Sequence, residues 1–170
     1  HFGITPDIVT LSKGLSSGYF PISACVVSES VVDAFDEAGE NALRHMGTYS
    51  GHATGCAVAL AVQQTIAREA LPAQAAARGE LIRERLEEIR ERNSAVVDHF
   101  RGIGMLWSIS LIVREGTDVA RAAVAECRRR GLLTQGLGGQ LFFYPPLVAT
   151  EQELDAMLTI VAEALAAVGE

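Results

Sequence analysis

The sequence predicts an α/β segment over residues 1–71, followed by a small α+β domain over residues 72–170. Two observations predict this division. Before Leu71 come two short β-branched apolar runs and a helix with almost no charge, which is typical of elements buried in a larger sheet. From Pro72 onward, amphipathic helices alternate with strands and turns, so this part can form a core of its own.

The first part begins with two expected strands that are separated by a loop rich in glycine and serine. Residues 6–12 and 22–28 contain the runs IVTL and ISACVVS, whose β-branched residues are typical of buried strands. A short helix is expected over residues 28–42, followed by a polar, glycine-rich loop over residues 44–56. The next helix, residues 56–71, is apolar all round for most of its length and is therefore expected to be buried.

The second part is predicted to contain a surface helix, four strands and two further helices. Arginines in the last turn of one helix precede Gly131, as expected at a helix C-terminus. Thr150 and Glu153 have the spacing of a capping box at the start of the last helix. The expected ranges are 72–92 for the surface helix, 95–102 and 105–113 for two strands, 117–131 for a helix, 131–147 for two short strands around a glycine turn, and 150–168 for the last helix.

Charge and composition exclude several classes of function. The formal net charge is −7 and the longest basic stretch is the arginine triplet 128–130, so the surface that binds nucleic acid is missing. No apolar run approaches the ~20 residues that span a membrane. The three cysteines are far apart and odd in number, which indicates a reducing compartment and predicts a cytoplasmic protein. Neither they nor the histidines have the spacing of a metal site, so no metal is expected.

Lys13 is the only lysine of the chain, and the other thirteen of its fourteen basic residues are arginines. An amine can lose its proton and attack a carbonyl carbon to form a Schiff base, whereas a guanidinium cannot. Lys13 follows an expected strand and precedes a Gly/Ser loop, which is where open α/β sheets place their ligands. An ordinary solvated lysine in an arginine-biased sequence is the alternative, and the lysine alone leaves both readings open.

The segment GTYSGHATG, residues 47–55, is the second candidate for chemistry. Small hydroxyl residues and glycines before a helix N-terminus can bind a phosphate, because free backbone N–H groups and the helix dipole favour an anion there. An ordinary capped loop is the alternative. A Schiff-base lysine and a phosphate loop together suggest a cofactor that carries both an aldehyde and a phosphate, and pyridoxal 5′-phosphate is the common one.

Four segments of the chain, taken in order, resemble the C-terminal part of class-III, fold-type-I aminotransferases, the group that contains ω-amino acid transaminases. The resemblance implies that residues 1–71 end the cofactor-binding large domain and that residues 72–170 form the small C-terminal domain. The segments are FGITPDIVTLSKGLSSGYFPISA (2–24), GTYSGHATGCAVALA (47–61), RGIGMLWSISLIV (101–113) and FFYPPLVATEQELD (142–155).

The resemblance also implies an activity and its residues. A pyridoxal 5′-phosphate enzyme of this family would move an amino group from an amine or ω-amino acid to a keto acid such as pyruvate or 2-oxoglutarate. Lys13 would form the internal aldimine and then act as general base and acid. Thr48 would hydrogen-bond the cofactor phosphate from the neighbouring subunit, which implies a homodimer with its active site at the interface. Tyr19 and Phe20 would lie near the substrate entrance.

The chain departs from the family pattern at several positions. Phe142 and Gln135 stand where carboxylate-binding arginines occur in some members, and Ala53 stands where the family usually has proline. The family's remaining cofactor contacts would precede His1, so an N-terminal portion is expected to be missing and the isolated fragment to be inactive. An aminomutase or decarboxylase of the same family, or a non-catalytic fragment that needs an N-terminal partner, are the alternatives.

Overall fold

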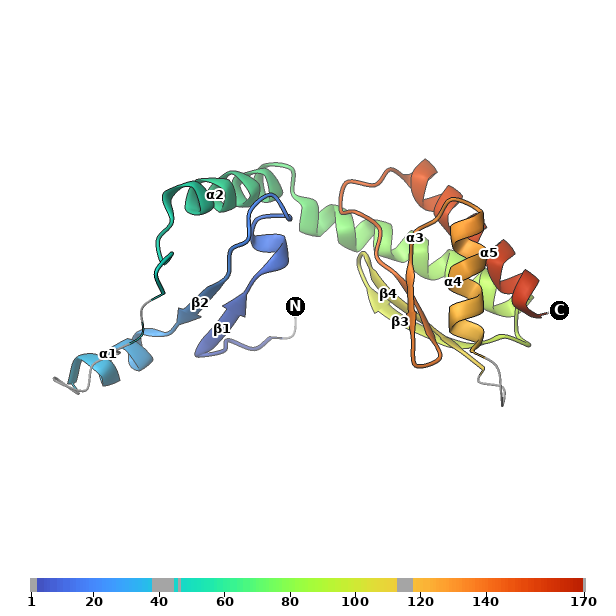
Figure 1. Ribbon diagram of the computed structural model, residues 1–170, viewed down its shortest axis with the longest axis horizontal. Coiled ribbons are helices and arrows are strands. Elements are labelled where there is room, and N and C mark those ends of the chain that lie inside the picture. The colour runs from blue at the N-terminus through green and yellow to red at the C-terminus, as the bar shows by residue number, and fades with distance from the viewer. Residues whose placement is uncertain (1–2, 38–44, 46, 113–117, 170) are drawn as a thin grey trace. The chain divides into compact units, whose positions relative to one another are not determined.

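The computed structural model describes residues 3–37, 45, 47–112 and 118–169. Contacts divide the chain into two compact units, His1–Glu69 and Ala70–Glu170 (Figure 1). The expected domain boundary after Leu71 lies in the first turn of helix α3 (Leu71–Arg92). No helix in the described ranges is both long enough and apolar enough to cross a membrane.

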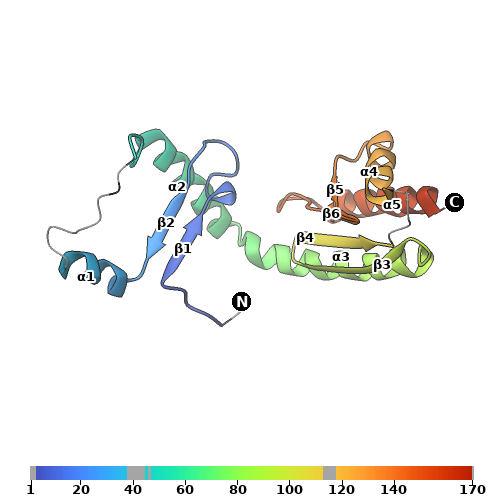
Figure 2. The ribbon, with the colours of Figure 1, turned by 60° about the horizontal axis from the view of Figure 1, so that its bottom comes forward.

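Over its described residues, the first unit combines a two-stranded sheet with two α-helices and one short 3-10 helix. The expected strands are present, and they pair antiparallel, with Ile8 opposite Val27 and Leu11 opposite Ala24. Figure 2 shows α2 beside the loop that joins the strands. The expected extension of the first helix beyond residue 37 lies outside the described residues. The elements are β1 (Ile8–Leu11), η1 (Lys13–Leu15), β2 (Ala24–Val27), α1 (Glu29–Glu37) and α2 (Ala53–Arg68).

The burial predicted for these strands and for α2 is not found within the described chain. Ile8 and Val26 are 56% and 53% exposed, and Leu60 of α2 is 60% exposed. Only Gly55 and Ala59 of α2 are buried. Two antiparallel strands cover neither face of their own sheet and are marginal in water by themselves. The described residues supply no further layer against these apolar side chains, which explains their exposure.

In the second unit, residues 70–112 and 118–169 are described, and they form a four-stranded antiparallel sheet with three helices. Its strand order is β3-β4-β6-β5. Trp107, Ile109 and Leu111 of β4 share a hydrophobic core with residues of all three helices, including Ile82 and Leu158. This alternation along β4 is expected for a strand with one buried face. The elements are α3, β3 (Val97–Ile103), β4 (Leu106–Leu111), α4 (Val119–Arg129), β5 (Gln135–Leu137), β6 (Gln140–Phe143) and α5 (Glu151–Gly169).

The caps and turns predicted in this unit are confirmed. The Thr150 amide donates to the Glu153 carboxylate at 2.8 Å, and the Glu153 amide donates to the Thr150 hydroxyl at 3.2 Å, which is a capping box. Gly131 ends α4 with a φ of 89°. The two-residue turn between β5 and β6 has φ values of 59° at Gly138 and 77° at Gly139, a backbone that favours glycine.

Candidate active site

The loop that carries Lys13 follows β1 directly and forms one turn of 3-10 helix. Lys13 is exposed and its φ is +50°, in the left-handed region that residues with a side chain rarely occupy. The Leu15 amide donates to the Ser12 carbonyl at 3.1 Å, and the Ser16 amide donates to the Lys13 carbonyl at 3.2 Å. The only lysine of the chain is therefore displayed on a tight, unusual turn at the end of a strand.

Two polar side chains hold this loop. Ser16 is 2% exposed, and its hydroxyl donates to the Phe20 carbonyl at 2.5 Å. Gln63 of α2 donates from its side-chain nitrogen to the carbonyl oxygens of Gly14 and Leu15, both at 3.1 Å. Gln63 is not among the site residues predicted from the sequence. The available signal was a polar side chain within a helix that is otherwise almost uniformly apolar.

The second candidate segment forms a tight turn that leads into α2. The Gly47 amide donates to the Ser50 hydroxyl at 3.1 Å, and the Ser50 amide donates to the Gly47 carbonyl at 2.9 Å. His52 is the N-cap of α2, where its Nδ1 accepts from the Gly55 amide at 3.2 Å. The segment therefore forms a capped loop, and the Thr48 side chain is not part of the cap.

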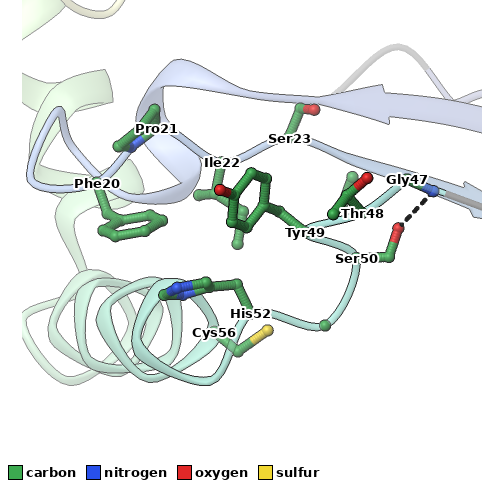
Figure 3. A pocket seen from close by; sticks show the side chains of 12 residues that line it. Phe20, Pro21, Ile22, Ser23, Gly47, Thr48, Tyr49, Ser50, His52 and Cys56 are labelled. Carbon is green, nitrogen blue, oxygen red and sulfur yellow. Dashed lines mark hydrogen bonds between the residues drawn. The ribbon is translucent and has the colours of Figure 1, made fainter.

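Residues 20–24, which follow the Lys13 loop, and residues from the segment 47–56 line one pocket of about 840 Å³ in the first unit (Figure 3). The rings of Phe20 and His52 are stacked at its wall, with centroids 5.1 Å apart and planes at 26°. Gly55 lies under Phe20, since a Cβ added there would be 2.8 Å from the Phe20 Cε1 atom. The lining residues are Phe20, Pro21, Ile22, Ser23, Ala24, Gly47, Thr48, Tyr49, Ser50, Gly51, His52 and Cys56.

The pocket is suited to an anion. Among the described residues, none that lines the pocket is a carboxylate, so none of these side chains repels a bound phosphate. It lies at the N-terminus of α2, where the helix dipole is positive and first-turn amides lack intrahelical acceptors. Thr48 and Ser50 add hydroxyl groups. These features match those that bind phosphate at helix N-termini in other proteins.

Some of the expected site residues line the pocket, and the others lie in the Lys13 loop outside it. Thr48 and Phe20 line the pocket, whereas Lys13 and Tyr19 are not among its lining residues. Tyr19 is 82% exposed. Within the described ranges, no three His, Cys, Asp or Glu side chains are grouped closely enough to hold a metal ion. The pocket and the Lys13 loop are nevertheless joined by α2, which starts at the pocket and contacts the loop through Gln63.

Comparison with known proteins relates the whole chain to one family. A family model described as aminotransferase class-III matches residues 1–165. An uncharacterised aminotransferase of Sinorhizobium fredii is 34% identical over 184 residues, which cover 99% of this chain and 38% of the relative. A diaminobutyrate–2-oxoglutarate transaminase of Halomonas elongata is 35% identical over 172 residues, which cover 93% of this chain and 36% of the relative.

Solved structures give the same relationship. A transaminase with L-alanine superposes with a TM-score of 0.91 and 31% identity, covering 98% of this chain and 41% of that structure. An amine transaminase of an uncultivated Pseudomonas species, in a PLP-bound (internal aldimine) form, has a TM-score of 0.88 and 33% identity over 97% of this chain and 39% of that structure. The chain thus spans about two fifths of the length of the proteins it matches.

Proposed function

Because the chain belongs to the class-III aminotransferase family, we propose that it supplies the C-terminal part of a pyridoxal 5′-phosphate-dependent aminotransferase. The reaction moves an amino group from an amine or ω-amino acid to a keto acid such as pyruvate or 2-oxoglutarate. The observation that carries the proposal is the solitary, exposed Lys13 on a left-handed turn at the end of β1. The fold predicted from the sequence agrees with the superposed transaminases.

The residues of this chain fit two parts of the cofactor. Lys13 offers an accessible amine for the aldehyde. For the phosphate, Thr48 lies in a pocket at the N-terminus of α2 whose described lining residues include no carboxylate. When bound, the cofactor acts as an electron sink that stabilises negative charge on the carbon bearing the amino group. The pyridine ring would be held by residues in the part of the relatives that this chain does not cover.

Lys13 would hold the cofactor and move a proton. A neutral amine accepts a proton at Nζ and returns it, which is general base and general acid catalysis by one atom. Arginine has a similar charge but cannot do this, because a guanidinium stays protonated at any accessible pH. The preference for arginine elsewhere in the chain therefore does not extend to the position where the chemistry needs an amine.

We place Thr48 on the phosphate of the neighbouring subunit's cofactor, in a homodimer. The support is that Lys13 does not line the pocket to which Thr48 belongs, so one copy of the described chain does not bring both residues to a single pocket. A cytoplasmic location is proposed with it. The thiols of Cys25 and Cys56 are free and exposed, a state that a reducing compartment preserves.

An amine or ω-amino acid is the proposed donor because Phe142 stands where some members of the family have a carboxylate-binding arginine. Phe142 stacks on Tyr144, with ring centroids 5.4 Å apart and planes at 22°. An aromatic pair offers an apolar surface and no positive charge for a carboxylate. Among the superposed structures, one is titled an amine transaminase. A carboxylate next to the reacting carbon, in an amino donor or in a keto acid, would need a partner at another position.

The test is reduction with borohydride in the presence of pyridoxal 5′-phosphate, followed by peptide mapping. Since Lys13 is the only lysine, a pyridoxyl mass on its peptide is unambiguous, and Lys13→Arg is the matched control. The chain is assayed alone and with a second polypeptide that supplies the part of the relatives it does not cover. Labelling of the N-terminal amine alone, under both conditions, would contradict the proposal. Turnover of an amino acid without any keto acid would instead indicate the aminomutase or decarboxylase alternative.

A further inference from the structure

Gln63 of α2 makes two side-chain hydrogen bonds to residues outside its own helix. Its side-chain nitrogen donates to two carbonyl oxygens, those of Gly14 and Leu15, which are 49 and 48 residues away in sequence. Both carbonyls belong to η1, the turn that carries Lys13. We infer that Gln63 is a positioning residue that holds Lys13 in its left-handed conformation, an inference that rests on the proposed function of Lys13.

The conformation of this loop requires external support. Lys13 and Ser17 have φ values of 50° and 51°, and residues with a Cβ adopt this region at an energetic cost. Such residues persist where the surrounding structure over-determines them. The other hydrogen bonds of the loop are local, because they join Leu15 to Ser12, Ser16 to Lys13, Tyr19 to Ser16, and the Ser16 side chain to Phe20. Local bonds stabilise the turn but do not attach it to a rigid element.

Gln63 supplies that attachment. The local backbone bonds use the carbonyls of Ser12, Lys13 and Ser16, so the carbonyls of Gly14 and Leu15 at the end of η1 are the ones that Gln63 satisfies. The side-chain amide nitrogen carries two hydrogens, which matches two acceptors at 3.1 Å each. Gln63 lies inside the 16-residue helix α2, away from its ends, where a helix is least subject to fraying.

The N-terminus of the same helix borders the pocket that contains Thr48. His52 caps α2 and lines the pocket with Thr48. Gln63 lies ten residues after the first residue of α2, Ala53, or roughly 15 Å along the axis at 1.5 Å per residue. Through α2, the Lys13 turn is thus fixed relative to the pocket. A site that needs a defined amine position is held most accurately by a rigid element rather than by its own loop.

Three variants separate this role from an incidental surface contact. Gln63→Met keeps the length and flexibility of the side chain and removes both donors. Gln63→Glu keeps its shape and, when ionised, presents only acceptors to the two carbonyls. Gln64→Met is the matched control, because Gln64 is the adjacent exposed glutamine and is not the donor to either carbonyl. All three changes keep good helix formers in α2.

The first experiment measures hydrogen exchange of the full chain by mass spectrometry, in the presence of a second polypeptide that supplies the part of the relatives that this chain does not cover. Peptides that contain residues 13–19 are expected to exchange about tenfold faster in Gln63→Met, as expected for loss of two ordinary hydrogen bonds, while β1 and α2 stay unchanged. Gln64→Met should match the wild type. In Gln63→Glu, protection should return below the ordinary carboxyl pKa of about 4.3, where the protonated group regains a donor. Equal exchange in all variants, or a loss spread over the whole unit, overturns the inference.

The second experiment measures the rate at which Lys13 is captured by pyridoxal 5′-phosphate and borohydride. Gln63→Met should slow this capture several-fold, and Gln64→Met should not. If the wild-type Lys13 is never captured, the proposed function fails, and the exchange experiment still decides whether Gln63 holds the loop. If Lys13 is captured at equal rates in wild type and Gln63→Met, the proposed function stands and Gln63 is not a positioning residue.

Discussion

A glycine under the pocket wall allows a sharp test of how the candidate site is packed. Gly55 lies in the first turn of α2 and is buried. A Cβ added there would be 2.8 Å from Cε1 and 2.9 Å from Cδ1 of Phe20, well inside ordinary van der Waals contact. The Phe20 ring cannot move away freely, because it is stacked on His52. We therefore expect Gly55→Ala to disturb the stack that forms the wall of the pocket.

Two opposing effects set the magnitude. Alanine is favoured over glycine in a helix by about 0.5–1 kcal/mol, whereas overpacking of this kind costs about 1–3 kcal/mol. The overpacking is the larger effect, so Gly55→Ala should destabilise the first unit by about 1 kcal/mol in the presence of Phe20. In a Phe20→Ala background the clash is gone, and the same change should stabilise α2 by about 0.5–1 kcal/mol. The sign of the effect should therefore invert.

The assay is a double-mutant cycle read by hydrogen exchange of the α2 amides, with the chain combined with a second polypeptide that supplies the part of the relatives that it does not cover. This readout reports the first unit, whereas the single tryptophan, Trp107, lies in the second unit. A coupling of about 1–3 kcal/mol between Gly55→Ala and Phe20→Ala is expected, the usual size for residues in contact. If Gly55→Ala has the same sign and size in both backgrounds, then Phe20 does not pack over Gly55 and the described pocket wall is wrong.

Two further predictions concern the second unit. Gly79→Ala should destabilise the second unit by about 1–3 kcal/mol, because the new Cβ would lie 2.7 Å from the Gly104 Cα. Urea unfolding followed by tryptophan fluorescence measures this loss, and an unchanged midpoint would contradict the prediction. Burial raises the pKa of the Cys127 thiol from 9.0 to about 11, so alkylation at about pH 8 should modify the exposed Cys25 and Cys56 and spare Cys127. Since the unfolded thiol ionises first, stability should fall as the pH rises from about 9 to about 11, and Cys127→Ala should remove that slope.

The second unit was the more predictable from sequence because its signals are local. A capping box, a glycine after a basic helix end and a Gly-Gly turn each depend on residues a few positions apart. Thr150 with Glu153, Gly131, and the turn at residues 138–139 all have the predicted structures. Trp107, which lies within the expected strand 105–113, is 5% exposed. Each of these features is decided by short-range backbone geometry that the sequence states directly.

The first unit was less predictable because its decisive contacts are long-range. No local pattern reveals that Gln63 binds carbonyls 48 and 49 residues earlier or that Lys13 has a positive φ. The chemistry of Lys13 was predicted from residue type rather than from geometry, by contrast with the arginines around it. The spacing of the histidines argues only against a metal site and does not reveal that the Nδ1 atom of His52 caps α2. Its position directly before a helix was the available signal.

The distribution of buried apolar residues leads to a last prediction, that the second unit folds by itself and the first does not. The hydrophobic core cluster lies entirely in residues 75–165, and about a hundred residues are enough for a stable core. The first unit instead exposes apolar side chains such as Ile4, 75%, and Ile8, 56%. A fragment that starts at Ala70, to keep α3 whole, should therefore be soluble and unfold cooperatively. Residues 1–69 should aggregate or remain unstructured until the uncovered part of the relatives is added, and a cooperative transition of 1–69 alone would show that its two strands need no further layer.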